Sequence, residues 1–272
     1  MNPSACTIAL MYLRAEMPFV AEWLDYHLRL GVDHVFLGLH VTEDLVDPSR
    51  YLVKKRPYAE LYDVDSTEAE LLERLFALLR PFAGRVSPYV VLRTDPDWVP
   101  AQRRFYNAVF GLHRHEFDWV CPHDIDEYLV PQGEFRTITA ALADCPDVYD
   151  AVVMEQVVVE PRWDDQRRPR PAPLLVPALR RCAEVVPMPH SVKTFTRCRA
   201  AAGLDVHEPE LLAGRLAVAD RRLLTYHLRG FPEHLPENNA SRLPVERQVY
   251  DMTDDRPFAL LLDRPPLAED AT

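Results

Sequence analysis

Residues 118–129 read Asp-Trp-Val-Cys-Pro-His-Asp-Ile-Asp-Glu-Tyr-Leu. The apolar run at 119–121 is typical of a buried strand, and it leads into three carboxylates, Asp124, Asp126 and Glu127. Like charges this close repel one another unless water or a cation stabilises them. A hard divalent ion such as Mn²⁺ or Mg²⁺ takes oxygen ligands and often keeps substrate phosphate as well. The stretch therefore predicts a metal-assisted diphosphate site, and a solvated surface turn is the alternative.

Strand-like and helix-like segments alternate around this stretch. Apolar runs of strand length occur at residues 7–13, 35–39, 86–92, 151–159 and 223–228. Apolar residues at helical spacing occur at residues 17–30, 68–79, 101–112 and 137–143. Gly31 marks the end of the first helix. This alternation predicts an α/β protein built on a doubly wound mixed sheet, mostly parallel and flanked by helices.

The acidic stretch resembles the Asp-x-Asp-Glu-aromatic-Leu motif of glycosyltransferases with the GT-A fold, in the family 92-like and family 2-like groups. The resemblance spans roughly residues 7–235. It is carried by residues in a shared order, namely Glu16, the segments 22–27 and 30–35, Gln102, Tyr106, Asn107, Lys193, His207, Tyr226 and His227.

The resemblance implies a GT-A-like domain that transfers a sugar from a nucleotide-sugar donor to a hydroxyl acceptor, such as a saccharide, with inversion. It also implies Mn²⁺ or Mg²⁺ as the cofactor, because the diphosphate leaving group needs a Lewis acid. From its length we expect one domain over residues 1–250. The acidic, proline-punctuated residues 251–272 predict a peripheral tail.

Metal and phosphate ligands are expected in and after the acidic motif. Asp126 is the first choice for direct ligation, and Asp124 is expected to bind either the metal or the ribose. His207 and His227 are candidates for a third metal ligand, with a structural histidine as the alternative for each. Lys193 is expected to pair with a phosphate or with a nearby acid, and a salt bridge in a loop is its alternative.

Donor-binding residues are expected upstream of the motif. Glu16 follows the first strand, where GT-A folds bind the nucleobase and ribose. The alternative is that Glu16 is an acid at a helix N-terminus that interacts favourably with the helix dipole. Gln102 and Tyr106 lie one helical turn apart, so they could line a site or be ordinary surface residues. Asn107 belongs to the same predicted donor-binding set.

The catalytic base is sought among carboxylates near the valine-rich strand at 151–159. An inverting transfer needs a carboxylate or histidine that takes the proton of the acceptor hydroxyl. Glu155 is the first candidate and Glu160 the second.

Some positions depart from the family pattern. Arg14-Ala15-Glu16 stands where the family has Lys-Asn-Glu, and Tyr226-His227 reverses the usual order. The family's Tyr-Asp-Asn-x-Ser-x-Asp segment is absent. A catalytically degenerate nucleotide- or sugar-binding protein is therefore the second hypothesis. A metal-dependent phosphohydrolase using Asp124 and Asp126 ranks last, because that chemistry usually places its acidic pair after the first strand.

Composition and charge limit the partners, cofactors and cellular location that we expect for the protein. A net charge of −11 over 272 residues argues against a nucleic-acid partner. The chain has eight glycines and no glycine-rich phosphate loop, which favours a metal as the neutraliser of a diphosphate. The five cysteines are expected to be reduced and buried. With no run of membrane-spanning length and no leader, a soluble cytoplasmic protein is the default expectation.

The segment at residues 161–189 differs in character from the rest. It holds seven prolines and six arginines with little periodicity. We expect an ordered loop or flap that shapes the acceptor side of the site.

Overall fold

The computed structural model describes residues 2–40, 66–91, 98–161, 183–219 and 222–228. Within these ranges only the backbone is described at positions 14, 15, 18, 98, 99, 157–161, 183–191 and 226–228. The predicted tail at 251–272 lies outside the described residues, as does most of the predicted flap.

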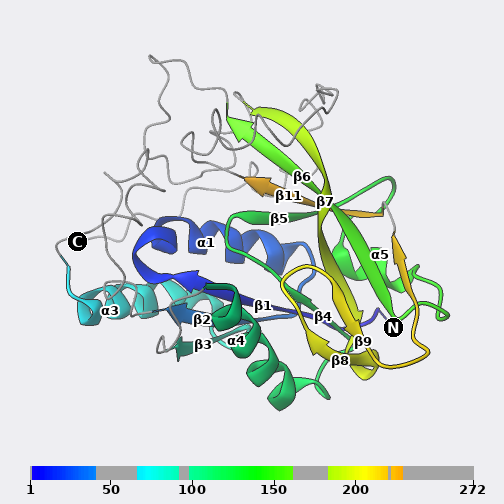
Figure 1. The fold of residues 1–272 in the computed structure, drawn as a ribbon. Helices are drawn as coiled ribbons and strands as arrows, with labels where there is room; N and C mark the ends of the chain where they lie inside the picture. Colours follow the sequence, from blue (N-terminus) through cyan, green and yellow to red (C-terminus); the bar gives the residue numbers. More distant parts are fainter. Residues whose placement is uncertain (1, 41–65, 92–97, 162–182, 220–221, 229–272) are drawn as a thin grey trace.

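The helices and strands follow one another along the chain (Figure 1). The α-helices are α1 (Leu13–Arg29), α3 (Glu68–Leu79), α4 (Trp98–His113) and α5 (Ile138–Ala143), and the 3₁₀ turns are η3 (Arg80–Phe82) and η4 (Cys198–Ala200). The strands of the first half are β1 (Ala5–Tyr12), β2 (His34–His40), β3 (Val86–Val91), β4 (Trp119–Pro122) and β5 (Glu127–Pro131). Those of the second half are β6 (Ala151–Pro161), β7 (Ala183–Arg197), β8 (Ala201–Leu204), β9 (Pro209–Leu211), β10 (Ala217–Ala219) and β11 (Leu223–Leu228).

Nine of the described strands form one sheet. Its order is β3-β2-β1-β4-β7-β6-β11-β5, and β10 pairs with β6. Strands β7 and β5 run against the others, so the sheet is mixed and mostly parallel. Strands β8 and β9 form a separate two-stranded sheet.

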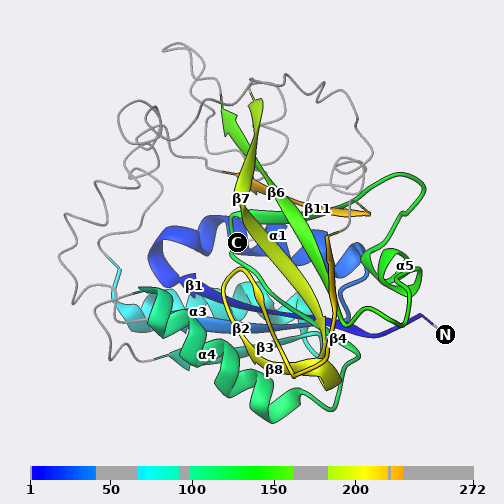
Figure 2. The same cartoon turned by 45° about the vertical axis from the view of Figure 1, so that its right-hand side comes forward.

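Helices cover both faces of this sheet. Alternate residues of β1 point to opposite faces. Ala9 and Met11 pack in one apolar core with α1 and α3, whereas Ile8 and Leu10 pack in a second core with α4. Figures 1 and 2 show α4 on the side of β1 and β2 that faces away from α1. The predicted fold class, a doubly wound mixed α/β sheet flanked by helices, is therefore confirmed.

The strand order reverses between β1 and β4. The chain adds β2 and β3 on one side of β1 and then returns through α4 to place β4 on the other side. In open α/β sheets, ligands bind outside the carboxyl ends of strands at such a reversal. Tyr12 ends β1 and His123 follows β4, so these two residues mark the edge where a site is expected.

The loop prediction for residues 161–189 is wrong at both ends. Pro161 belongs to β6, and residues 183–189 belong to β7, where Pro187 lies opposite Val157. Strand β4 pairs with β7 only as far as Val120 opposite Thr196, so among the described residues no strand lies on the β4 side of this outer part of β7. Proline is tolerated there because one edge of the strand needs no ladder bonds.

The structure also tests the expected burial of one helix residue and of the cysteine thiols. The helical spacing at 101–112 predicts Leu112 on the buried side of α4, but it is 70% exposed, because Ala108 and Leu112 lie on the face turned away from the core. Free, buried thiols are confirmed for Cys6, Cys121, Cys145 and Cys198. Cys182 lies outside the described residues.

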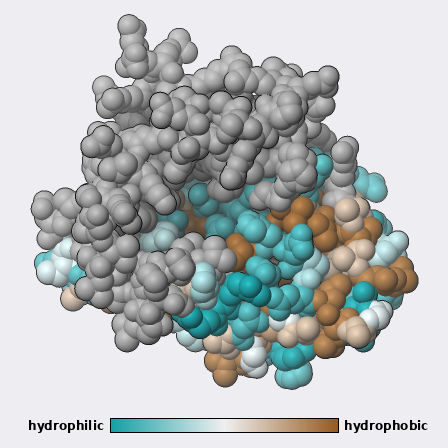
Figure 3. All heavy atoms as spheres, in the orientation of Figure 1, coloured by the Kyte–Doolittle hydropathy of each residue, from teal (hydrophilic) through white to brown (hydrophobic). Residues whose placement is uncertain are grey.

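None of the described helices is long and apolar enough to cross a membrane. On the face drawn in Figure 3, apolar residues reach the surface toward the right and lower edges, with polar residues between them.

Candidate functional site

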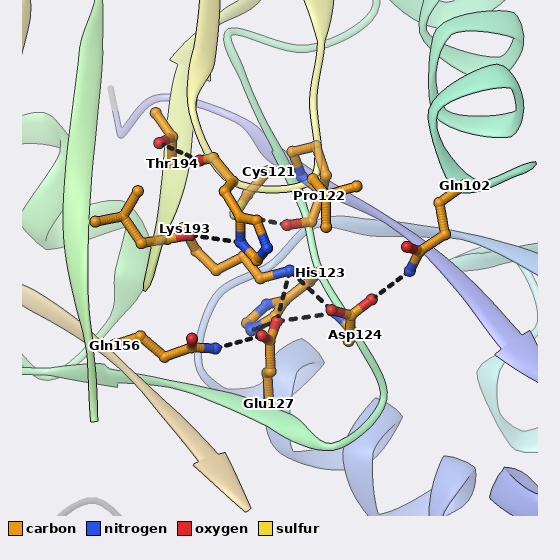
Figure 4. Close-up of polar contacts among 12 residues, drawn as sticks. Gln102, Cys121, Pro122, His123, Asp124, Glu127, Gln156, Lys193 and Thr194 are labelled. Carbon is orange, nitrogen blue, oxygen red and sulfur yellow. Dashed lines mark hydrogen bonds and ion pairs between the residues drawn. The ribbon is translucent and has the colours of Figure 1, made fainter. Parts of the chain in front are cut away.

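The acidic motif forms a tight turn between β4 and β5. Glu127 N donates to Asp124 O over 3.1 Å, which closes the turn. Asp124 N in turn donates to Oε2 of Glu127, also over 3.1 Å. The Glu127 side chain therefore folds back over the turn, so that it lies beside the carboxylate of Asp124 (Figure 4). The whole turn sits at the carboxyl end of β4, the edge where the strand order reverses.

Helix α4 supplies hydrogen-bond donors to Asp124. Gln102 Nε2 donates to Asp124 Oδ1 over 2.7 Å, and the Tyr106 hydroxyl donates to the same oxygen over 3.5 Å. Gln102 and Tyr106 also contact each other over 3.2 Å. Both are buried, so the interpretation that they line a site fits the structure better than an ordinary surface role.

Strand β7 places a lysine between the two carboxylates. Lys193 Nζ lies 2.9 Å from Asp124 Oδ2 and 3.0 Å from Glu127 Oε2. Lys193 is fully buried, a state that lysine almost never adopts without a charged partner. The loop alternative for Lys193 is wrong, since the residue stands in a strand and its ammonium is shared by two acids.

Two further side chains contact the carboxylate of Glu127. Gln156 Nε2, on β6, donates to Glu127 Oε1 over 2.5 Å. His123 Nε2 lies 3.5 Å from Glu127 Oε2. Together with Lys193, these side chains reach the buried carboxylate of Glu127 from β6, β7 and the turn itself, and Asp124 N adds a backbone hydrogen bond. Held in this way, Glu127 can orient the neighbouring residues of the site.

Helix α1 fixes strand β5, and with it Glu127. Trp23 Nε1 donates to the backbone oxygen of Glu127 over 2.8 Å, and the Tyr26 hydroxyl donates to Leu129 O over 2.7 Å. Leu129 N donates to His27 Nε2 over 3.2 Å. The sequence segment 22–27 thus has a physical role, because its ring side chains bind the backbone of the strand that carries Glu127.

The electrostatics of the cluster follow from burial and charge. Burial lowers the pKa of Lys193, but the charges of Asp124 and Glu127 and their hydrogen bonds act in the other direction and raise it above its usual value. Burial raises the pKa of Tyr106 well above its ordinary range, and the charges of Asp124, Glu127 and Glu16 raise it further. Lys193 is therefore charged and Tyr106 neutral at physiological pH.

Glu16 and Asp126 lie at the same edge of the sheet. The carboxylate of Glu16, in the first turn of α1, accepts a bond from Tyr12 N over 2.7 Å. Its charge also acts on Tyr106, which places it near the cluster. Asp126 is half-buried within the turn. Among the described residues, no three His, Cys, Asp or Glu side chains lie close enough to hold a metal ion.

Other predicted residues lie at the rim of the cluster or away from it. His207 is exposed, and its Nδ1 lies 3.1 Å from Val192 O. The pKa of His207 is lowered first by partial burial and then by the charge of Lys193, so the two residues are neighbours. Asn107 is turned toward the small β8–β9 sheet, where it accepts from Leu204 N and donates to Leu204 O. Its observed contacts are structural.

The candidate bases and His227 remain predictions. Glu155 is exposed on β6, whereas its neighbour Gln156 is buried against Glu127. A register shift in the β6–β7 pairing falls between these two residues. Glu160 and His227 are described by their backbone alone, with Glu160 opposite Glu184 and His227 between Glu127 and Val158. The backbone of His227 therefore adjoins the start of β5.

Sequence reasoning did not select Gln156 and His123 as site residues. Gln156 stands within a valine-rich run, where a lone amide among apolar residues is a usable signal of a buried hydrogen bond. His123 immediately precedes the acidic motif, and its contact with Glu127 depends on the turn geometry.

A separate cavity of about 390 Å³ lies at the opposite edge of the sheet. It is lined by Arg114, His115, Phe117, Asp118, Arg197 and Arg199. These residues stand just before β4 and at or just after the end of β7, away from the acidic cluster. We place the functional site at the cluster, because it combines buried charge, converging polar side chains and the reversal of strand order.

Comparisons with known proteins give fold-level likenesses. No family model and no curated protein sequence matches the chain. Among solved structures, the mannosyltransferase PcManGT from Pyrobaculum calidifontis, in complex with GDP-Man and Mn²⁺, is 13% identical at a TM-score of 0.42, over 95% of this chain and 69% of that one. HddC from Yersinia pseudotuberculosis is 10% identical at a TM-score of 0.32, over 71% of this chain and 77% of that one. Both TM-scores are below 0.5, so the functional argument rests on the site itself.

Proposed function

We propose that the protein is a glycosyltransferase that moves a sugar from a nucleotide-sugar donor to a hydroxyl acceptor. The observation that carries the proposal is the position of the acidic turn, which stands at the carboxyl ends of β1 and β4, where the strand order reverses. This is the edge at which open α/β sheets bind nucleotides. The likeness of the turn to the Asp-x-Asp-Glu-aromatic-Leu motif supports the same chemistry.

Asp124 is the part of the cluster that a donor can reach. It keeps 24% of its side chain exposed, whereas Lys193 and Glu127 behind it are buried. Gln102, Tyr106 and Lys193 hold it in one orientation. A fixed carboxylate of this kind can accept bonds from the hydroxyl groups of a donor at little entropic cost, because its rotamer is already locked.

The proposed reaction includes Mn²⁺ or Mg²⁺, and the motif carboxylates are the ligand type that these ions take. When bound, the ion stabilises the negative charge that develops on the diphosphate leaving group. Asp126 is the proposed protein ligand, because it stands in the acidic turn beside Asp124, whose oxygens accept bonds from Gln102 and Lys193. His227 and His207 remain candidates for a further contact.

Transfer with inversion requires a base that takes the proton of the acceptor hydroxyl. Glu155 and Glu160 on β6 are the proposed candidates, with Glu155 first. Glu155 is exposed, so an acceptor can reach it directly. The arginine-rich residues at 162–182 are proposed to contribute to acceptor binding.

The test is a panel of nucleotide sugars incubated with the protein and Mn²⁺, with release of nucleoside diphosphate as the readout. We expect release from one donor, loss of that release in Asp126→Ala, and loss on adding a chelator. Glu73→Ala, an exposed acid of α3, is the matched control and should retain full activity. Saturable binding of a nucleotide sugar without release would favour the second hypothesis, a nucleotide- or sugar-binding protein that has lost catalysis. Absence of both binding and release across the panel would refute the proposal.

A further inference from the structure

The ammonium of Lys193 stands where a cation shared by Asp124 and Glu127 would stand. Its Nζ atom lies 2.9 Å from Asp124 and 3.0 Å from Glu127, and the residue has no exposure to solvent. In Figure 4 Lys193 enters from β7 and points into the space between the two acids. The protein therefore carries its own counter-ion inside the acidic motif.

Every oxygen of these two carboxylates has a hydrogen-bond donor from the protein. Oδ1 of Asp124 accepts from Gln102, and Oδ2 accepts from Lys193. Oε1 of Glu127 accepts from Gln156, and Oε2 accepts from Asp124 N and from Lys193. A divalent ion would have to displace these donors, and it would meet the positive charge of Lys193 at close range.

We infer that Lys193 is a resident counter-ion that closes Asp124 and Glu127 to free divalent cations. The inference deepens the proposed function and rests on it for one consequence, namely that the metal reaches the site as a complex with the donor diphosphate. In that complex the phosphate oxygens supply most of the ligands, and Asp126 supplies the protein ligand. Magnesium-type ions commonly bind in this way, through one or two carboxylates together with substrate phosphates.

Removing the ammonium should create a cation site. Lys193→Ala leaves two adjacent carboxylates around the space that the lysine occupied, and their mutual repulsion then favours any cation that enters. Oxygen ligands and retained water in this space suit Mn²⁺. The variant is thus expected to gain metal binding, the opposite of what loss of a ligand or of structure would produce.

The experiment titrates Mn²⁺ into the protein without any nucleotide, with free Mn²⁺ followed by its paramagnetic resonance signal. We expect no saturable binding to the natural protein. Lys193→Ala should bind one ion per chain, and the ion should raise its melting temperature. The double variant Lys193→Ala, Asp124→Asn is the matched control, and it should lose this binding because one of the two carboxylates is gone.

Two results would overturn the inference. One is a nucleotide-free natural protein that binds one Mn²⁺ per chain and loses it in Asp124→Asn. The other is a folded Lys193→Ala variant that binds no ion. Should Lys193→Ala not fold, the titration of the natural protein and of Asp124→Asn still decides the question. Because no donor sugar is present, the outcome is separate from that of the transfer assay, which tests the proposed function.

Discussion

A fall in pH from 7 to 5 should destabilise the protein through His27, the histidine of α1 that binds strand β5. Its Nε2 accepts a bond from Leu129 N, and its Nδ1 donates to Trp23 O. The bond to Nε2 requires the neutral ring, because a protonated Nε2 cannot accept, and complete burial lowers the pKa of His27 from 6.5 to about 3. The unfolded chain therefore takes up a proton below pH 6.5, whereas the folded chain does not do so until about pH 3.

The magnitude follows from the two pKa values. Stability due to the neutral ring is complete above pH 6.5 and is lost as the pH falls toward 3. For a shift of this size, linkage predicts a loss of about 2 kcal/mol in the free energy of unfolding at pH 5. This loss comes from one of the ten histidines in the sequence.

Urea unfolding at pH 7 and pH 5, followed by tryptophan fluorescence, measures this loss. His27→Gln removes the titrating group, so its free energy of unfolding should fall less between the two pH values than that of the natural protein. His115→Gln, at an exposed position, is the control and should show the natural pH dependence. Equal pH dependence in the natural protein and in His27→Gln would refute the assignment of a buried, neutral ring.

Three further substitutions have defined outcomes. Gly38→Ala should lower the melting temperature, because its Cβ would lie 2.7 Å from the Phe105 ring, and overpacking of this kind costs about 1–3 kcal/mol. An unchanged melting temperature would refute this. Asn107→Leu should destabilise the protein by about 1–3 kcal/mol by leaving Leu204 N and O unpaired, which chemical denaturation would measure. Gln156→Leu should lower the release of nucleoside diphosphate in the panel assay through misplacement of Glu127, and full activity would argue against that role for Gln156.

Much of the fold follows from local patterns. The apolar spacing alone predicts a helix at residues 68–79 with the bounds of α3, because this pattern is local. The structure adds a capping box between Thr67 and Glu70. Strand β11 was also expected with its observed bounds, 223–228. Strand β5 was missed, because its first residue is one of the motif acids that had been assigned to a strand end.

The sequence predicts which residues belong to the site, but it does not predict which of them contact one another. Asp124, Gln102 and Lys193 were all selected from the sequence, yet nothing in it places Lys193 between two acids. That contact joins residues 69 positions apart and depends on the pairing of β7 with β4 and β6. The buried state of Lys193 is therefore a property of the sheet topology.

A crystal structure with a bound nucleoside diphosphate would locate the donor site. We expect the ligand at the carboxyl ends of β1 and β4, beside Asp124 and near Glu16. A ligand found only in the arginine-lined cavity at the opposite edge, against Arg114 and Arg197, would contradict the assignment of the acidic turn as the donor site.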